Sequence, residues 1–231
     1  MGLPLLILPG LMCDDRMFAP TLAGLPNAQV IGGWYGAATS LAAMAEYALA
    51  LAPPRFDLLG HSMGARIALE VLRLAPGRVG RLILADTGIH PAAPGEREKR
   101  YALRDLGRAQ GFAALVDHWL PPMLAAHRRG DPAITAPLRA MCLAAGQATF
   151  ERQTEALLAR PPLDALLAAI TCPTLSITGA LDSWSPPAQH EAIAAAIPGA
   201  ALAIVPGAGH MLPFEDPAAF NAEVARFLGA N

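Results

Sequence analysis

The chain has 231 residues, of which 54% are hydrophobic and 16% charged, which suits one well-filled domain with at most an insertion. The formal net charge of -2 and the isoelectric point near 6.3 give no reason to expect nucleic acid or an anionic membrane as partner, because both select basic surfaces. A small-molecule partner is therefore expected.

Short sequence patterns exclude several further classes of protein. The three cysteines, Cys13, Cys142 and Cys172, have no spacing typical of a disulfide framework or a zinc site. The apolar N-terminus lacks the Lys or Arg of a secretory signal, and no run of about 18 apolar residues could span a membrane. No HExxH or GxxxxGK[ST] pattern occurs. We expect a cytoplasmic protein without metal or cofactor.

Short apolar runs alternate with longer Ala- and Leu-rich segments along most of the chain. The short runs predict strands at residues 3–8, 28–31, 56–59, 81–85, 174–178 and 201–205. Most of them are apolar throughout, which is typical of parallel strands buried on both faces. Helices are predicted at residues 41–51, 63–74, 187–197 and 217–228. The alternation predicts a three-layer α/β fold.

The alternation stops between residues 91 and 170, where most of the clustered charge lies. This segment predicts several helices, broken at Pro121-Pro122, at Gly130-Asp131-Pro132 and at Pro161-Pro162. We interpret residues 91–170 as a helical insertion, so that residues 1–90 and 171–231 form the core.

The stretch FDLLGHSMGARIAL places Ser62 between a predicted strand and a predicted helix. Residues 60–64 spell G-x-S-x-G, a pattern that chance gives in about one in ten chains of this length. The context is more specific: in a nucleophile elbow the serine occupies a strained strand-to-helix turn, and the glycines let strand and helix approach. The alternative is an ordinary turn in which Ser62 caps the helix.

A serine nucleophile needs a base, and His210 lies in a Gly-rich loop after the last predicted strand. Loops that follow parallel strands lie at the carboxyl edge of the sheet, where Ser62 is also expected. His61 is expected to point away from the site. The other histidines are interpreted as surface or packing residues: His90, His118, His127 and His190.

The imidazole also needs an acceptor that fixes its tautomer. Asp182 follows the strand at 174–178 and gives the chain order Ser, Asp, His. Asp86 ends the strand at 81–85 on the same edge and stays an alternative acid, although Asp182 is favoured. For Asp182, an ordinary turn or cap role is the competing interpretation.

An oxyanion needs two donors, which we expect to be backbone N–H groups. Met63 directly follows the predicted nucleophile, and Leu11 lies in the loop after the first predicted strand. Main-chain donors make the side-chain types unimportant at both positions. Cys13, near this loop, is not expected to be a nucleophile because no base follows it in a suitable order.

Together, GHSMGA, ITGALDSWSPP and PGAGHMLPFEDP resemble the α/β-hydrolase superfamily, especially its small cytoplasmic carboxylesterases, enol-lactone hydrolases, proline iminopeptidases and carbon-carbon bond hydrolases. The resemblance implies that residues 91–170 are a cap over the nucleophile. It also shows two departures. Pro9-Gly10 stands where the family usually has His-Gly, and we expect the family's first antiparallel hairpin to be missing, so about six mostly parallel strands are expected.

These features predict a serine hydrolase that cleaves a small carboxylic ester through an acyl-enzyme, with Ser62 as nucleophile, His210 as base and then acid, and Asp182 as orienting carboxylate. Two alternatives stay open. The same triad serves carbon-carbon bond or enol-lactone hydrolysis, and the fold also suits a ligand-binding or sensor protein.

The insertion offers weak indications of the substrate. Trp119, Met123 and Met141 are interpreted as core packing, with an apolar pocket lining as the alternative. Arg128-Arg129 is interpreted as a solvated loop, with binding of a substrate carboxylate as the alternative.

Overall fold

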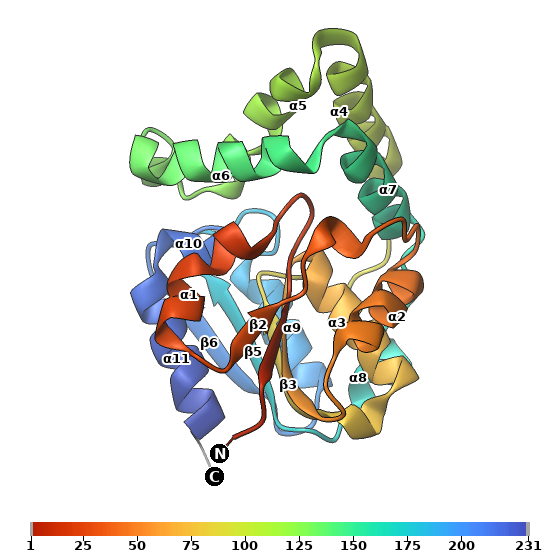
Figure 1. Ribbon diagram of the computed structural model, residues 1–231, viewed down its shortest axis with the longest axis vertical. Coiled ribbons are helices and arrows are strands. Elements are labelled where there is room, and N and C mark those ends of the chain that lie inside the picture. Colours follow the sequence, from red (N-terminus) through yellow and green to blue (C-terminus); the bar gives the residue numbers. More distant parts are fainter. Residues whose placement is uncertain (1, 230–231) are drawn as a thin grey trace.

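A sheet of six parallel strands forms the centre of the molecule (Figure 1). The structure is a computed structural model that describes residues 2–229. In sheet order the strands are β2 (Ala28–Val30), β1 (Leu5–Leu8), β3 (Phe56–His61), β4 (Val79–Ala85), β5 (Thr174–Gly179) and β6 (Ala201–Val205). The predicted α/β class and the six-stranded parallel sheet are confirmed.

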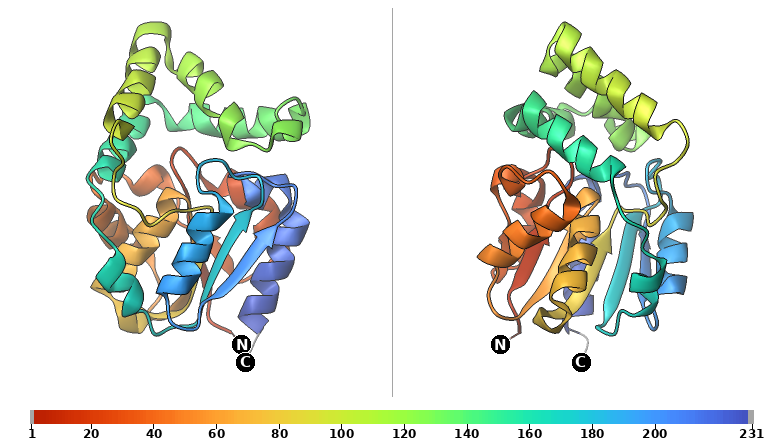
Figure 2. Two further views of the ribbon diagram at one scale, coloured as in Figure 1. Left: turned by 180° about the vertical axis from the view of Figure 1, so that it is seen from behind. Right: turned by 90° about the vertical axis from the view of Figure 1, so that its right-hand side faces the viewer.

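Helices cover both faces of this sheet (Figure 2). Successive residues of β1 enter different cores: Leu5 and Ile7 pack in one cluster, Leu6 and Leu8 in the other. The first cluster is closed by α1 (Ala19–Gly24), α10 (Leu212–Glu215) and α11 (Pro217–Gly229). The second is closed by α2 (Leu41–Leu51), α3 (Met63–Leu74), α8 (Asp164–Ala168) and α9 (Pro187–Ala196). Burial on both faces explains why the strands are apolar throughout.

Four helices of the segment between β4 and β5 lie over the carboxyl edge of the sheet (Figures 1 and 2). They are α4 (Glu96–Gln110), α5 (Phe112–Trp119), α6 (Pro132–Ala145) and α7 (Gln147–Leu158). Two of their breaks were not predicted, at Gly111 and Gly146, which have φ of 93° and 78°. A lone glycine in a helical pattern gives little warning of a break, whereas this backbone conformation favours glycine strongly.

The helix α8 lies within the interval 91–170, yet it packs on the core. Leu163, Leu167 and Ile170 are buried in the second cluster, together with side chains of α3 and α9. The apolar face of α8 is buried against the sheet layer, away from the four helices over the edge. The domain boundaries at 90 and 170 stay a prediction.

The observed elements differ from the predicted ones mainly at their ends. Strand β3 continues to His61, so Ser62 is the first residue after it. The described part of the chain also contains five short 3-10 helices: Asp15–Phe18, Gly33–Tyr35, Pro76–Arg78, Pro121–Met123 and Ala126–Arg128. None of the helices between residues 2 and 229 is long and apolar enough to cross a membrane.

An ion-pair cluster joins the start of the cap helices to their end. Glu96, at the first turn of α4, pairs with Arg160 just after α7 at 2.6 Å and with Arg100 at 2.8 Å. Burial alone would raise the pKa of Glu96, but hydrogen bonds from the two guanidinium groups outweigh it and hold this pKa at about 2. The cluster therefore stabilises the folded form while Glu96 is ionised.

Helix α3 crosses β1 with no space for a side chain at Gly64, where an added Cβ would lie 1.9 Å from the carbonyl oxygen of Leu8. We expect Gly64→Ala to lower the free energy of unfolding by about 3 kcal/mol or more, because backbone must move to admit the methyl group. Urea denaturation measures this. Gly77→Ala is the control, since nothing lies within 4 Å of its Cβ position; equal losses in the two variants would contradict the close approach.

The Glu96 cluster predicts a pH-dependent stability. A carboxyl whose pKa is lower in the folded than in the unfolded chain stabilises the fold above its unfolded pKa, and this contribution disappears as the pH falls through the folded pKa. Glu96→Gln should therefore lower the free energy of unfolding by about 2 kcal/mol at pH 7. The difference from wild type should shrink as the pH falls from 5 toward 3, as measured by urea denaturation.

The matched control for that experiment is Glu98→Gln, an exposed residue of the same helix. Its effect should stay within about 0.5 kcal/mol at every pH. A difference between Glu96→Gln and wild type that stays constant from pH 7 to pH 3 would show that ionisation of Glu96 is not the source of the stabilisation.

Candidate active site

Ser62 occupies a strained turn between β3 and α3. Its φ of 56° and ψ of −116° lie outside the usual regions for an L-residue. Its N–H donates to the carbonyl of Ala85 at 2.8 Å, and its own carbonyl accepts from the hydroxyl of Thr87 at 3.0 Å. A Cβ at Gly60 would lie 2.4 Å from Cα of Ala65. The sequence thus permits the sharp turn that exposes the Ser62 hydroxyl.

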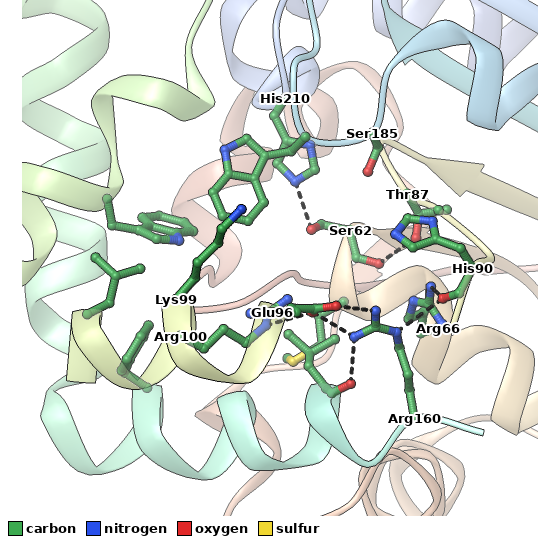
Figure 3. Close-up of a pocket in the computed structure, with 17 residues that line it drawn as sticks. Ser62, Arg66, Thr87, His90, Glu96, Lys99, Arg100, Arg160, Ser185 and His210 are labelled. Carbon is green, nitrogen blue, oxygen red and sulfur yellow. Dashed lines mark hydrogen bonds and ion pairs between the residues drawn. The ribbon is translucent and has the colours of Figure 1, made fainter. Parts of the chain in front are cut away.

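The structure brings Ser62, His210 and Asp182 into one hydrogen-bonded chain. The hydroxyl of Ser62 lies 2.8 Å from Nε2 of His210, and Nδ1 of His210 lies 2.7 Å from Oδ2 of Asp182. Since a carboxylate only accepts, Nδ1 donates to Asp182 and Nε2 is free to accept the serine proton. His210 lies between β6 and α10, and Asp182 follows β5, so all three residues lie at the carboxyl edge of the sheet. Figure 3 shows the contact between Ser62 and His210 in the pocket.

The surroundings of Asp182 favour its ionised form. Oδ1 of this buried carboxylate accepts from the backbone N–H groups of Trp184 at 2.8 Å and Ser185 at 2.9 Å. Burial raises the pKa of Asp182, but the charge of His210 and the hydrogen bonds outweigh it, so the pKa lies below its usual value. Asp182 can therefore orient His210 and stabilise a positive charge on it.

Asp86, the alternative acid, does not contact His210. Its Oδ1 accepts from the hydroxyl of Thr178 at 3.1 Å and from the N–H of Gly179 at 3.2 Å. Burial, and then the charge of Asp182, raise the pKa of Asp86 well above its usual value, which favours the protonated form. The geometry therefore separates two aspartates that the sequence places on the same edge.

His61 points away from the pocket and supports the loop that bears His210. Its Nε2–H donates to the carbonyl of His210 at 2.9 Å, and the ring is buried. Burial, and then the charge of His210, lower the pKa of His61 to about 3, so the ring is neutral. Its role was missed from the sequence, because no spacing rule links a histidine to a carbonyl 149 positions away.

The loop after β1 lies against the serine. A Cβ at Gly10 would lie 2.9 Å from Nδ1 of His61 and 3.1 Å from Cβ of Ser62, so a larger residue would not fit. The predicted oxyanion donors are the N–H groups of Leu11 in this loop and of Met63 at the start of α3. Within residues 2–229 neither N–H donates to another protein group. Both are therefore uncommitted.

The cap also fixes this loop and the histidine. The next N–H of the loop, that of Met12, donates to Oε1 of the buried Gln153 on α7 at 2.9 Å. The N–H of His210 donates to the carbonyl of Met123 at 2.8 Å. Sequence reasoning missed Gln153, because a single polar residue in an amphipathic helix gives no signal of a distant backbone partner.

Glu215 holds the backbone on both sides of His210. Its Oε1 accepts from the N–H groups of Gly209 at 3.0 Å and Met211 at 3.1 Å, and its Oε2 accepts from the N–H of Ala125 at 2.9 Å. Burial raises the pKa of Glu215 even though these three donors lower it. One buried carboxyl thus connects the histidine loop to the segment between α5 and α6.

A pocket of about 260 Å³ opens over Ser62 (Figure 3). Residues of the core edge and of the cap helices line it: Ser62, Met63, Arg66, Thr87, Gly88, His90, Glu96, Lys99, Arg100, Leu103, Trp119, Phe150, Leu157, Arg160, Trp184, Ser185 and His210. Its volume suits a small ligand. No position among residues 2–229 gathers three His, Cys, Asp or Glu side chains that could hold a metal ion.

The insertion residues fall into different places. Trp119, Met123 and Met141 are all buried in the first core cluster, and Trp119 also lines the pocket. Arg128 and Arg129 do not line the pocket; they donate to carbonyl groups of the backbone instead.

His190 and Cys13 do not line the pocket. His90 lines the pocket, which the interpretation as a surface or packing residue did not include. His190 is a buried packing residue that accepts from the N–H of Thr87 and contacts the hydroxyl of Ser176. Cys13 is buried, and burial raises the pKa of its thiol well above the usual value.

Known proteins resemble this chain over most of its length. A thermophilic esterase from Thermogutta terrifontis, solved with malate bound, superposes with a TM-score of 0.88 at 28% identity, covering 99% of this chain and 90% of that one. A protein of Variovorax paradoxus (strain S110), provisionally named as the carbamate hydrolase RutD, is 28% identical over 181 residues, covering 78% of this chain and 68% of the relative.

A third relative, the 2-hydroxy-6-oxononadienedioate/2-hydroxy-6-oxononatrienedioate hydrolase of Cupriavidus pinatubonensis, is 31% identical over 182 residues, covering 76% of this chain and 62% of the relative. The profile of the Alpha/beta hydrolase family matches residues 7–223. The parallel sheet, the turn at Ser62 and this match over nearly the whole chain agree: the protein belongs to the alpha/beta hydrolase family.

Proposed function

We propose that the protein is a serine hydrolase that cleaves small carboxylic esters through an acyl-enzyme. The observation that supports it most is the chain of contacts from the Ser62 hydroxyl to His210 at 2.8 Å and from His210 to Asp182 at 2.7 Å. A hydroxyl in a strained turn, a base within hydrogen-bond reach and an acceptor behind that base are what nucleophilic catalysis by serine needs.

In the proposed reaction Oγ of Ser62 attacks the ester carbonyl carbon while Nε2 of His210 takes the hydroxyl proton. The N–H groups of Leu11 and Met63 stabilise the oxyanion of the tetrahedral intermediate. His210 then gives its proton to the departing alkoxide, which leaves as an alcohol. Water, deprotonated by His210, attacks the acyl-enzyme, and His210 then returns that proton to Oγ of Ser62 as the acid leaves.

The esterase from Thermogutta terrifontis supports an ester as substrate, because it resembles this chain over 99% of its length. The dienedioate hydrolase relative supports the alternative, in which the same three residues cleave a carbon-carbon bond or an enol-lactone. A ligand-binding or sensor protein on this fold is a further alternative, which the proposed triad disfavours.

A fluorophosphonate probe tests the nucleophile. We expect the native protein to be labelled at Ser62, because the phosphorus centre traps an activated serine hydroxyl, and we expect no labelling of Ser62→Ala. Mass spectrometry of the labelled peptide identifies the residue. Folded wild-type protein that stays unlabelled would contradict the proposal.

The substrate is tested with short nitrophenyl esters, an enol-lactone and a ring-cleavage product, with Ser62→Ala as the control. An ester preference of several orders of magnitude in kcat/KM would exclude the carbon-carbon alternative. The reverse preference would establish it. Tight ligand binding without turnover above the uncatalysed rate would favour the binding protein.

The two aspartates predict different kinetics. Asp182→Asn should lower kcat by a factor of about 10² to 10⁴, because the amide NH2 group can donate to Nδ1 of His210, which favours the wrong tautomer, and the neutral amide does not stabilise a charged imidazole. Asp86→Asn, the matched control, should keep kcat within about tenfold, since Asp86 does not contact His210. Steady-state kinetics of both variants on the best ester shows which aspartate acts on His210. A larger loss from Asp86→Asn would overturn the assignment of Asp182.

A further inference from the structure

One part of the pocket lining is strongly cationic. Arg66, Lys99, Arg100 and Arg160 line the pocket together with a single carboxylate, that of Glu96, which leaves three positive charges in excess apart from the histidines. Figure 3 shows Lys99 extending into the pocket and Glu96 between Arg100 and Arg160, with Arg66 farther along, next to His90. The whole chain has a formal charge of -2, so this excess is local.

Two of these cations already have partners. Arg100 pairs with Glu96 at 2.8 Å, and Arg160 pairs with it at 2.6 Å. Arg160 also donates to the carbonyls of Leu157, Pro91 and His90. Both guanidinium groups are therefore committed to holding the cap.

The other two cations have no carboxylate partner among residues 2–229. Arg66 is 6% exposed, and its one hydrogen bond there goes to the carbonyl of His90 at 2.8 Å. Burial, and then the charge of Arg160, lower the pKa of Arg66, although a guanidinium stays charged near neutral pH. Lys99 is exposed on α4 and forms no ion pair in this range. A buried, unpaired cation is costly, and an anion in the pocket would offset this cost.

The rest of the lining is mostly apolar. The side chains of Leu103, Trp119, Phe150, Leu157 and Trp184 face the same pocket of about 260 Å³. A ligand that fits this lining has a short apolar body and one anionic group. A guanidinium binds a planar carboxylate through two parallel hydrogen bonds, so a carboxylate suits Arg66 well.

We propose that the substrate bears a free carboxylate in addition to the bond that is hydrolysed, and that Arg66 binds this carboxylate while Lys99 adds positive charge to the same pocket. The inference rests on the hydrolase function proposed above and specifies its substrate class: half-esters of short dicarboxylic acids. Arg66 lies on the first turn of α3, four residues after Ser62, so the helix that follows the nucleophile also supplies the anion-binding group.

Kinetics with a matched pair of esters tests this. Wild-type protein should cleave mono-4-nitrophenyl glutarate with a kcat/KM at least about tenfold above that for 4-nitrophenyl pentanoate, which has the same chain length and no charge. Arg66→Gln should lower kcat/KM for the charged ester by about 10- to 100-fold, mostly through KM, and leave the neutral ester within about threefold. Arg66→Lys should restore part of the loss.

Two further variants keep the test valid even if Arg66→Gln does not fold. Lys99→Gln, on an exposed position, should lower the preference for the charged ester by about three- to tenfold. Arg139→Gln is the matched control, because this exposed arginine of α6 pairs with Asp117 outside the pocket; both esters should be cleaved as by wild type. No preference in the wild type, or an equal loss on both esters in Arg66→Gln and Lys99→Gln, would overturn the proposal.

A binding measurement separates this proposal from the hydrolase function. Ser62→Ala protein should bind glutarate in calorimetry, and adding Arg66→Gln should weaken the binding at least about tenfold. If no ester is cleaved but glutarate binds through Arg66, the carboxylate site stands and the hydrolase function fails. If esters are cleaved without charge preference and glutarate does not bind, only this proposal fails. Tighter binding of monobutyl phosphate than of glutarate would also contradict the assignment of a carboxylate as the anionic group of the ligand.

Discussion

The site depends on the close approach of helix α3 to the ends of strands β1 and β3. Glycine at position 64 allows the helix to touch the carbonyl of Leu8, and glycine at position 60 allows the strand to turn under Ala65. This packing holds the backbone of Ser62 at a φ of 56°. That conformation costs of order 1–3 kcal/mol and persists only where the surroundings fix it. The carbonyl of Ala85 and the hydroxyl of Thr87 do so.

His210 faces this turn from a loop whose backbone groups form hydrogen bonds with both the core and the cap. Its carbonyl accepts from His61 of the core, while its N–H donates to Met123 in the segment before α6. Glu215 accepts the N–H groups on either side of His210 and also that of Ala125. The cap is thus part of what positions His210, in addition to lining the pocket.

Sequence patterns predicted those features that follow from position along the sheet. Ser62, Asp182 and His210 each follow a strand, and parallel strands place such residues at one edge. The same rule could not separate Asp182 from Asp86, because the difference lies in which N–H and imidazole groups surround each carboxyl. Pairs formed across the cap, such as Glu96 with Arg160 64 positions away, have no local sequence signal.

The two aspartates behind the histidine have opposite environments. Asp182 receives two backbone N–H groups and the imidazole, which outweigh burial and favour its charge. Asp86 is fully buried near that charge, and its pKa is raised first by burial and then by the negative charge of Asp182. The carboxylate of Asp182 lies behind His210, on the side away from Ser62. Positive charge lies in the pocket at Arg66 of α3 and at Lys99 of α4, so the core and the cap together set the field across the site.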